Sequence, residues 1–170
     1  MELWDLIDGE RRPLNKTHVR GQHMEPGTYH TVVCVWTVTP KQKILLTLRH
    51  PQKDEYPDFW ENTAGSAQAG ETSRQGAVRE LFEETGIRAA EDELKLLGVR
   101  KEKSQFADTY VVRKDIEPGK LILQEGETVD ARWVTLAELD RLIAAGRVAP
   151  PVAARLELIR KEFEAFLFSR

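Results

Sequence analysis

Between Glu71 and Thr85 the sequence contains one glycine and no proline, and its residues separate into two faces when they are wound as a helix. At about 100° per residue, the side that would enter a core holds Ala77, Val78, Leu81, Phe82 and Thr85, and the opposite side holds Glu80, Glu83 and Glu84. Thr72 and Ser73 are capping residues for the start of such a helix, and Gly86 is a typical stop. The pattern predicts a helix over residues 71–85 with one core face and one acidic face.

Most of the other regular segments have the pattern of strands. Residues 31–39 form a β-branched run, and residues 44–48 are too continuously apolar to have a water-facing side, which predicts a central strand. Shorter strands are expected at residues 3–7, 95–99, 109–112, 121–123 and 132–134. A capping box begins a second helix over residues 135–145, and apolar residues spaced by three or four predict a last helix within 150–170. The mixture predicts an α+β fold in which helices cover sheets.

Length and charge exclude several classes of function. The 170 residues are enough for one domain, in which residues 1–27 form a strand-rich N-terminal extension and residues 150–170 a C-terminal helix. The net charge of −3 gives no general attraction to a nucleic acid polymer or an anionic membrane. No apolar run approaches the length of about 20 residues that a membrane helix needs, and no signal peptide pattern is present, so we expect a cytoplasmic protein. A single cysteine, Cys34, excludes an internal disulfide and a cysteine metal cluster.

The acidic face of the predicted helix needs a positive partner. Three carboxylates at positions i, i+3 and i+4 repel one another, and a helix gains no stability from that arrangement. Mg²⁺ prefers carboxylate and water oxygens and is often completed by substrate phosphates, so a cation on this face would suit metal-assisted phosphate chemistry. A solvated helix face is the alternative.

The spacing of the residues around this helix favours the metal. In order, the pattern is Gly65, five residues, Glu71, seven residues, Arg79-Glu80-Leu81, one residue, Glu83-Glu84, one residue and Gly86-Ile87. It resembles the Nudix box at every specified position. Flanking segments also resemble a Nudix domain, and the resemblance covers about residues 28–146. It implies an α/β/α sandwich, with a mixed sheet and flanking helices, that hydrolyses a nucleoside diphosphate linked to a further group X.

The resemblance also implies roles for individual residues. Those that would hold Mg²⁺ or Mn²⁺ are Glu80, Glu83, Glu84 and the carbonyl of Gly65. Glu71 and Arg79 would form a supporting ion pair, in which the arginine orients a carboxylate.

Glu80 and Glu83 are the expected catalytic glutamates, and Glu83 is the first candidate for the general base. The base varies within the family, so Glu125 and Glu127, in a polar turn before the strand at 132–134, are the alternatives.

Basic and aromatic residues near the box are candidates for binding a small-molecule diphosphate. Arg20, Arg49 and Lys53 would contact its phosphates or an acidic leaving group, with solvated surface charges as the alternative. Trp60 and Phe106 would stack on a nucleobase, with packing in the core as the alternative.

Among the branches of the family, this chain most resembles the one that contains isopentenyl diphosphate isomerase, which supplies a second hypothesis. His23 and His30 have the separation of two of its metal ligands, but ordinary structural roles are favoured for them, with substrate contacts as a further alternative. Where the isomerase has Cys-Gly-His, this chain has Ala64, Gly65 and Ser66, so a catalytic cysteine and a histidine ligand are missing. A third hypothesis is a non-catalytic nucleotide-binding sensor, which the intact box disfavours. The oligomeric state stays open, a homodimer through residues 1–27 or the last helix being one alternative.

Overall fold

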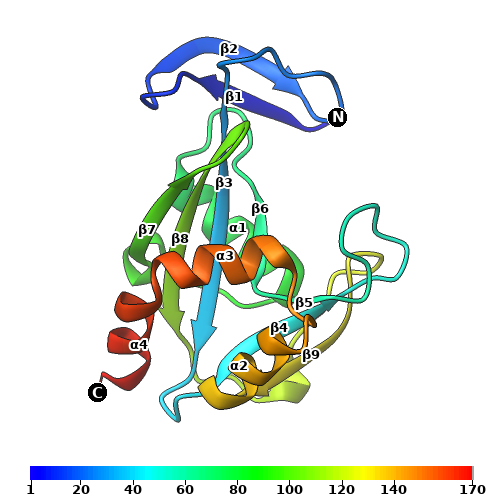
Figure 1. Cartoon of the computed structure of the whole chain (residues 1–170), viewed down its shortest axis with the longest axis vertical. Coiled ribbons are helices and arrows are strands. Elements are labelled where there is room, and N and C mark those ends of the chain that lie inside the picture. Colours follow the sequence, from blue (N-terminus) through cyan, green and yellow to red (C-terminus); the bar gives the residue numbers. More distant parts are fainter. Residues whose placement is uncertain (170) are drawn as a thin grey trace.

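The computed structural model describes residues 1–169 and arranges them as a mixed sheet with helices on both faces (Figure 1). The strands are β1 (Leu3–Ile7), β2 (Pro13–Val19), β3 (His30–Val38), β4 (Ile44–Arg49), β5 (Trp60–Glu61), β6 (Thr63–Ser66), β7 (Lys95–Lys101), β8 (Gln105–Arg113) and β9 (Thr128–Val134). The helices are α1 (Ser73–Thr85), α2 (Leu136–Ala144), α3 (Pro150–Leu158) and α4 (Arg160–Phe168), with short 3-10 turns η1 (Glu91–Glu93) and η2 (Pro118–Lys120). The predicted α+β class and flanked mixed sheet are confirmed.

Strand β3 is the centre of the sheet. It pairs in parallel with β8 along its whole length, and the order of the main path is β5-β4-β3-β8-β7. Its side chains alternate between two cores, as the period of a strand requires. Val33 and Val35 pack with Ala77 and Leu81 of α1, whereas Trp36 packs with residues of α3 and α4 on the other face.

The sheet divides on one side of β3, and this division positions the site. The first half of β3 pairs with β6, from Val32 to Val35, whereas its last residues pair with β4 only at Val38 and Ile44. Strand β9 pairs with β4 along its length, and the short strand β5 pairs with β4 only at Thr47 and Leu48. Strands β6 and β4 therefore diverge from a shared neighbour, and residues of both line the main polar cavity described below.

Strands β1 and β2 form a separate hairpin near the start of β3 (Figure 1). Ile7 and Tyr29 exchange two backbone hydrogen bonds of 2.8 and 2.9 Å, which dock β1 beside the first residues of β3. The strand-rich character predicted for residues 1–27 thus takes the form of a hairpin packed on the domain. Within the described residues, no helix combines the length and apolarity that crossing a membrane requires.

Two segments differ from the sequence predictions. Residues 121–123, predicted as a strand, form no regular element, because Ile122 instead donates its backbone N–H to the Thr85 carbonyl and closes over the end of α1. The single helix predicted within 150–170 is two helices, broken at Ile159, whose φ of −112° departs from helical values. The side chain of Ile159 fills the space beside Gly98, where a Cβ would lie 2.5 Å from it. Residue 170, the last of that predicted helix, lies outside the described residues.

Candidate active site

A polar cavity of about 630 Å³ opens between β4, β5, β6 and α1. Charged side chains supply most of its lining. The acidic ones are Glu2, Asp54, Glu55, Glu61, Glu80, Glu83, Glu84 and Glu127, and the basic ones are Arg20, Arg49, Lys53 and Arg79. Because carboxylates outnumber basic groups, the cavity has a negative electrostatic potential that would attract a cation, and the net charge of the chain does not reveal it.

Helix α1 carries the acidic cluster, and local sequence fixes both of its ends. The Thr72 side chain accepts from the Gln75 backbone while the Gln75 side chain accepts from the Thr72 backbone, which completes a capping box. Gly86 ends the helix with a left-handed φ of 73°, a conformation that glycine adopts without cost. Because Ala77 and Leu81 are fully buried, the glutamates on the opposite face are directed toward the cavity.

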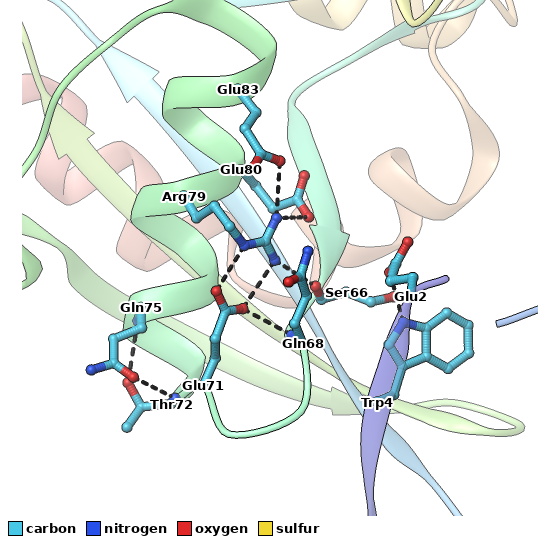
Figure 2. A network of polar contacts seen from close by, with 10 residues as sticks. All are labelled: Glu2, Trp4, Ser66, Gln68, Glu71, Thr72, Gln75, Arg79, Glu80 and Glu83. Carbon is cyan, nitrogen blue, oxygen red and sulfur yellow. Dashed lines mark hydrogen bonds and ion pairs between the residues drawn. The ribbon is translucent and has the colours of Figure 1, made fainter. Parts of the chain in front are cut away.

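The guanidinium of Arg79 gathers three carboxylates around itself (Figure 2). Its Nε and Nη2 donate to the two oxygens of Glu71 at 2.8 and 3.0 Å, and Nη2 also donates to the Ser66 carbonyl at 2.9 Å. Its Nη1 donates to Glu80 at 2.8 Å and to Glu83 at 3.0 Å. The Glu71–Arg79 ion pair therefore links the loop before α1 to the acidic face of the helix.

Burial perturbs two of the helix glutamates. It raises the pKa of Glu80, and the negative charges of Glu83 and Glu2 add to this effect. It raises the pKa of Glu84 well above the usual range, and the charges of Glu61 and Glu80 raise it further. The Oε2 atom of Glu84 is buried and has no hydrogen-bond partner among the described residues. An ionised carboxylate in this position lacks the compensation that buried charges normally have.

Gly65 makes room for the cluster. A Cβ at this position would lie 2.1 Å from the carboxyl carbon of Glu80 and 2.3 Å from its Oε1. Only glycine therefore permits the Glu80 carboxylate to lie directly against β6.

The donor set fits a hard divalent cation. Carboxylate oxygens and a backbone carbonyl are the ligands that Mg²⁺ and Mn²⁺ prefer, and the orphaned Oε2 of Glu84 is an unused one. Across residues 1–169, no three acidic, histidine or cysteine side chains are arranged so that they already surround one ion. Arg79 accounts for this at the helix, because it holds Glu80 and Glu83 by direct hydrogen bonds.

The structure separates the predicted substrate-binding residues into two groups. Arg49 and Lys53 line the cavity, where Arg49 donates to Glu61 at 2.9 and 3.1 Å and Lys53 forms an ion pair with Glu127. Trp60 and Phe106 are buried and are not part of the cavity lining.

The cation–π contacts of these two aromatic rings leave little of their faces open. Arg132 lies 4.1 Å from the centroid of Trp60, and Arg11 lies 5.2 Å from that of Phe106. Of the two histidines singled out in the sequence, His30 lines the cavity, and His23 and the base candidate Glu125 do not.

Sequence reasoning missed several residues of the cavity. Glu61 is buried on β5, burial raises its pKa, and its carboxylate acts on Glu84. Its position directly after an aromatic residue, Trp60, was the only local signal in the sequence for it. Glu2 and Trp4 reach the cavity from the N-terminal hairpin, and no local pattern indicates that docking.

Comparison with known proteins decides the family. A model of the NUDIX domain matches residues 28–156. The chain is a Nudix hydrolase. It is 38% identical to an uncharacterized Nudix hydrolase of Listeria monocytogenes over 156 residues, which cover 88% of this chain and 89% of the relative. A crystal structure of a Deinococcus radiodurans protein has a TM-score of 0.75 at 23% identity, covers 94% of this chain and 98% of its own, and supports the fold alone.

Isomerases of the same fold are similar over a shorter span of this Nudix hydrolase. An isopentenyl-diphosphate Delta-isomerase of Pectobacterium atrosepticum is 33% identical over 86 residues, which cover 50% of this chain and 48% of the isomerase. Cys34 does not replace the cysteine that is missing beside Gly65. It is buried on β3, accepts a hydrogen bond from Arg155 at 3.3 Å, and burial raises its pKa to about 11. A thiol in that state is a packing residue rather than an acid or base at the cavity.

Proposed function

We propose that this Nudix hydrolase cleaves the phosphoanhydride of a nucleoside diphosphate linked to a further group, or of a similar small diphosphate, with Mg²⁺ or Mn²⁺ as its cofactor. The observation that carries the proposal is the state of Glu84, a buried carboxylate with an unpartnered oxygen on the wall of a cavity of about 630 Å³. A cation at this carboxylate would relieve the burial of its charge. Arg49 and Lys53 line the same cavity, where they would bind phosphate oxygens.

The residues that would hold the cation are Glu80, Glu83, Glu84 and the carbonyl of Gly65. When bound, such a cation neutralises phosphate charge and acidifies a water molecule. Arg79 serves as the positioning residue for these ligands, because Glu71 and the Ser66 carbonyl fix its guanidinium from one side while Glu80 takes its Nη1. Orientation of a ligand by a second hydrogen-bonded group is the usual support for a metal site.

Glu83 is the general base in this proposal. Its side chain is 42% exposed, the most accessible of the ion-paired carboxylates around Arg79, so it can reach a water molecule in the cavity. Glu127 also lines the cavity, but Lys53 holds its carboxylate in an ion pair. Removing a general base lowers turnover by about 10²–10⁴-fold.

The test measures hydrolysis of a panel of nucleoside diphosphates and nucleotide sugars with Mg²⁺, with Mn²⁺ and with a chelator. The readout is the release of phosphate or of nucleoside monophosphate. We expect metal-dependent turnover by the wild type and its loss in Glu83→Gln with the fold retained. Glu157→Gln is the matched control, because Glu157 is an exposed helix glutamate outside the cavity. If Glu83→Gln remains active and Glu127→Gln does not, the base is Glu127.

Absence of turnover across the panel, with nucleotide still bound, would refute catalysis and favour a sensor. Turnover that persists in the chelator would refute the role of the metal. A cytoplasmic location and a homodimer stay predictions from the sequence.

A further inference from the structure

The N-terminal hairpin forms part of the cavity wall although it precedes the residues that match the Nudix domain. Glu2 and Trp4 come from the β1 end of the hairpin, and Arg20 follows β2. All three side chains line the cavity, and we call them the hairpin wall.

The hairpin is tied firmly to the domain. Besides the Ile7–Tyr29 pair, the contacts that fix it include Leu3 with Ala69 at 2.8 Å, Asp5 with Gly70 at 2.8 Å and Arg11 with Asp108 at 2.6 and 2.8 Å. Asp108 is buried and also accepts a hydrogen bond from Ser73, the first residue of α1. The hairpin wall is therefore held in register with the helix that carries the glutamates.

Within the hairpin wall, polar contacts fix each side chain to the next. The indole of Trp4 stacks on the buried ring of His30, with centroids 4.0 Å apart and planes 9° apart. Its Nε1 donates to one oxygen of Glu2 at 2.7 Å, and Arg20 donates to the other oxygen at 2.7 Å. Such preorganisation lowers the entropy that binding a ligand would otherwise cost.

The hairpin wall faces the acidic cluster of α1. Figure 2 shows Glu2 and Trp4 beyond Ser66 as seen from Arg79. Hydrogen bonding to Glu2 raises the pKa of Arg20, and the charges of Glu127 and Glu80 contribute to the same shift. Arg20 therefore lies within electrostatic reach of both the helix and the loop that close the cavity.

The chemistry of the hairpin wall is hydrogen bonding rather than stacking. The Trp4 ring already has aromatic neighbours, since His30 stacks on it and the ring of His18 lies 5.8 Å away at a tilt of 32°. Glu2 accepts hydrogen bonds, and Arg20, whose side chain is 62% exposed, has guanidinium N–H groups beyond the one that Glu2 takes. Nδ1 of His30 is a further polar atom at this wall, buried and without a hydrogen-bond partner among residues 1–169.

We propose that the hairpin wall determines specificity by binding the part of the substrate beyond the diphosphate, through a donor N–H or O–H received by Glu2 and an adjacent acceptor bound by Arg20. This inference rests on the proposed diphosphatase activity. A nucleobase edge and a sugar diol both offer a donor beside an acceptor, so the assay contains both.

The experiment compares kcat/KM for four nucleoside diphosphates that differ in the base, two nucleotide sugars that differ in the sugar, and methyl diphosphate, which lacks both groups. The variants are Glu2→Gln, which keeps an acceptor for Trp4, and Arg20→Ala. Arg12→Ala is the matched control, because Arg12 lies on the same hairpin, is 70% exposed and is outside the cavity. The readout is the ratio of kcat/KM for each nucleotide to that for methyl diphosphate, which is independent of the fraction of folded enzyme.

We expect this ratio to fall at least tenfold in both variants, through KM, and to keep its wild-type value in Arg12→Ala. A fall that depends on the base identifies a nucleobase edge, and one that depends on the sugar identifies a diol. An unchanged ratio in an active enzyme, or an equal fall in Arg12→Ala, overturns the role of the hairpin wall and leaves the proposed function standing. A wild-type enzyme that cleaves nothing in the panel overturns the proposed function instead.

Discussion

Replacing Gly65 by alanine should separate catalysis from stability. A Cβ at residue 65 would lie 2.1 Å from the Glu80 carboxyl carbon, and ordinary contact begins near 3.4 Å, so that carbon must move by about 1.3 Å. A displacement of about 1 Å at a catalytic group costs on the order of 100-fold in rate. The moving group is the end of a flexible side chain, and we expect the free energy of unfolding to change by no more than about 1 kcal/mol.

The assay measures kcat/KM for diphosphate hydrolysis, metal affinity by titration calorimetry, and stability by urea unfolding. Gly119→Ala is the control, because no described atom lies within 4 Å of its Cβ position and its φ is not left-handed. We expect Gly65→Ala to lose about 100-fold in kcat/KM and to bind the metal more weakly, with both properties unchanged in Gly119→Ala. A Gly65→Ala enzyme within twofold of the wild type would refute the idea that Glu80 must lie against β6.

Two further predictions concern buried titratable groups. Because the pKa of Glu84 is raised in the folded state, its ionisation opposes folding as pH rises above its usual range, so Glu84→Gln should raise the Tm of the metal-free protein at pH 7.5. The same variant should lose the stabilisation by Mn²⁺ that we expect of the wild type. Burial lowers the pKa of His30 from 6.5 to about 4 in the folded protein. As pH falls from 6.5 to 4, the imidazole is therefore protonated in the unfolded chain before it is protonated in the folded one. The stability that the neutral ring contributes above pH 6.5 is then lost. Between pH 7.5 and 4.5 the free energy of unfolding, measured with urea, should fall by about 2–3 kcal/mol more in the wild type than in His30→Phe. Equal acid sensitivity of the two proteins, or a lower Tm in metal-free Glu84→Gln, would contradict these assignments.

The parts of the fold that sequence predicts well are those that local physics determines. Helix α1 begins and ends where capping residues and Gly86 indicate, and its two faces follow from the period of a helix. The buried central strands follow from their unbroken apolar runs. Each of these features depends on residues within one element.

The parts that sequence misses depend on contacts between distant elements. Trp60 ends a polar loop and has the residue type of a binding platform, but its backbone pairs with residues 147–149, and this buries its ring. Trp4 has an unremarkable strand environment and reaches the cavity only because the hairpin docks on β3 and on the loop before α1. No local period encodes either contact, because each pairs residues dozens of positions apart.

The network around Arg79 divides its hydrogen bonds between framework and cavity. Nε and Nη2 bind Glu71 and the Ser66 carbonyl, so the guanidinium stays in place whatever happens at Nη1. Nη1 alone bridges Glu80 and Glu83, and these are the contacts that a cation would compete for. Glu84 accepts no hydrogen bond from Arg79, although its carboxylate is more deeply buried than that of Glu80. Of the three glutamates on the acidic face of α1, Glu84 is therefore the one that Arg79 does not bind, and a cation there would recover the electrostatic free energy that folding has cost.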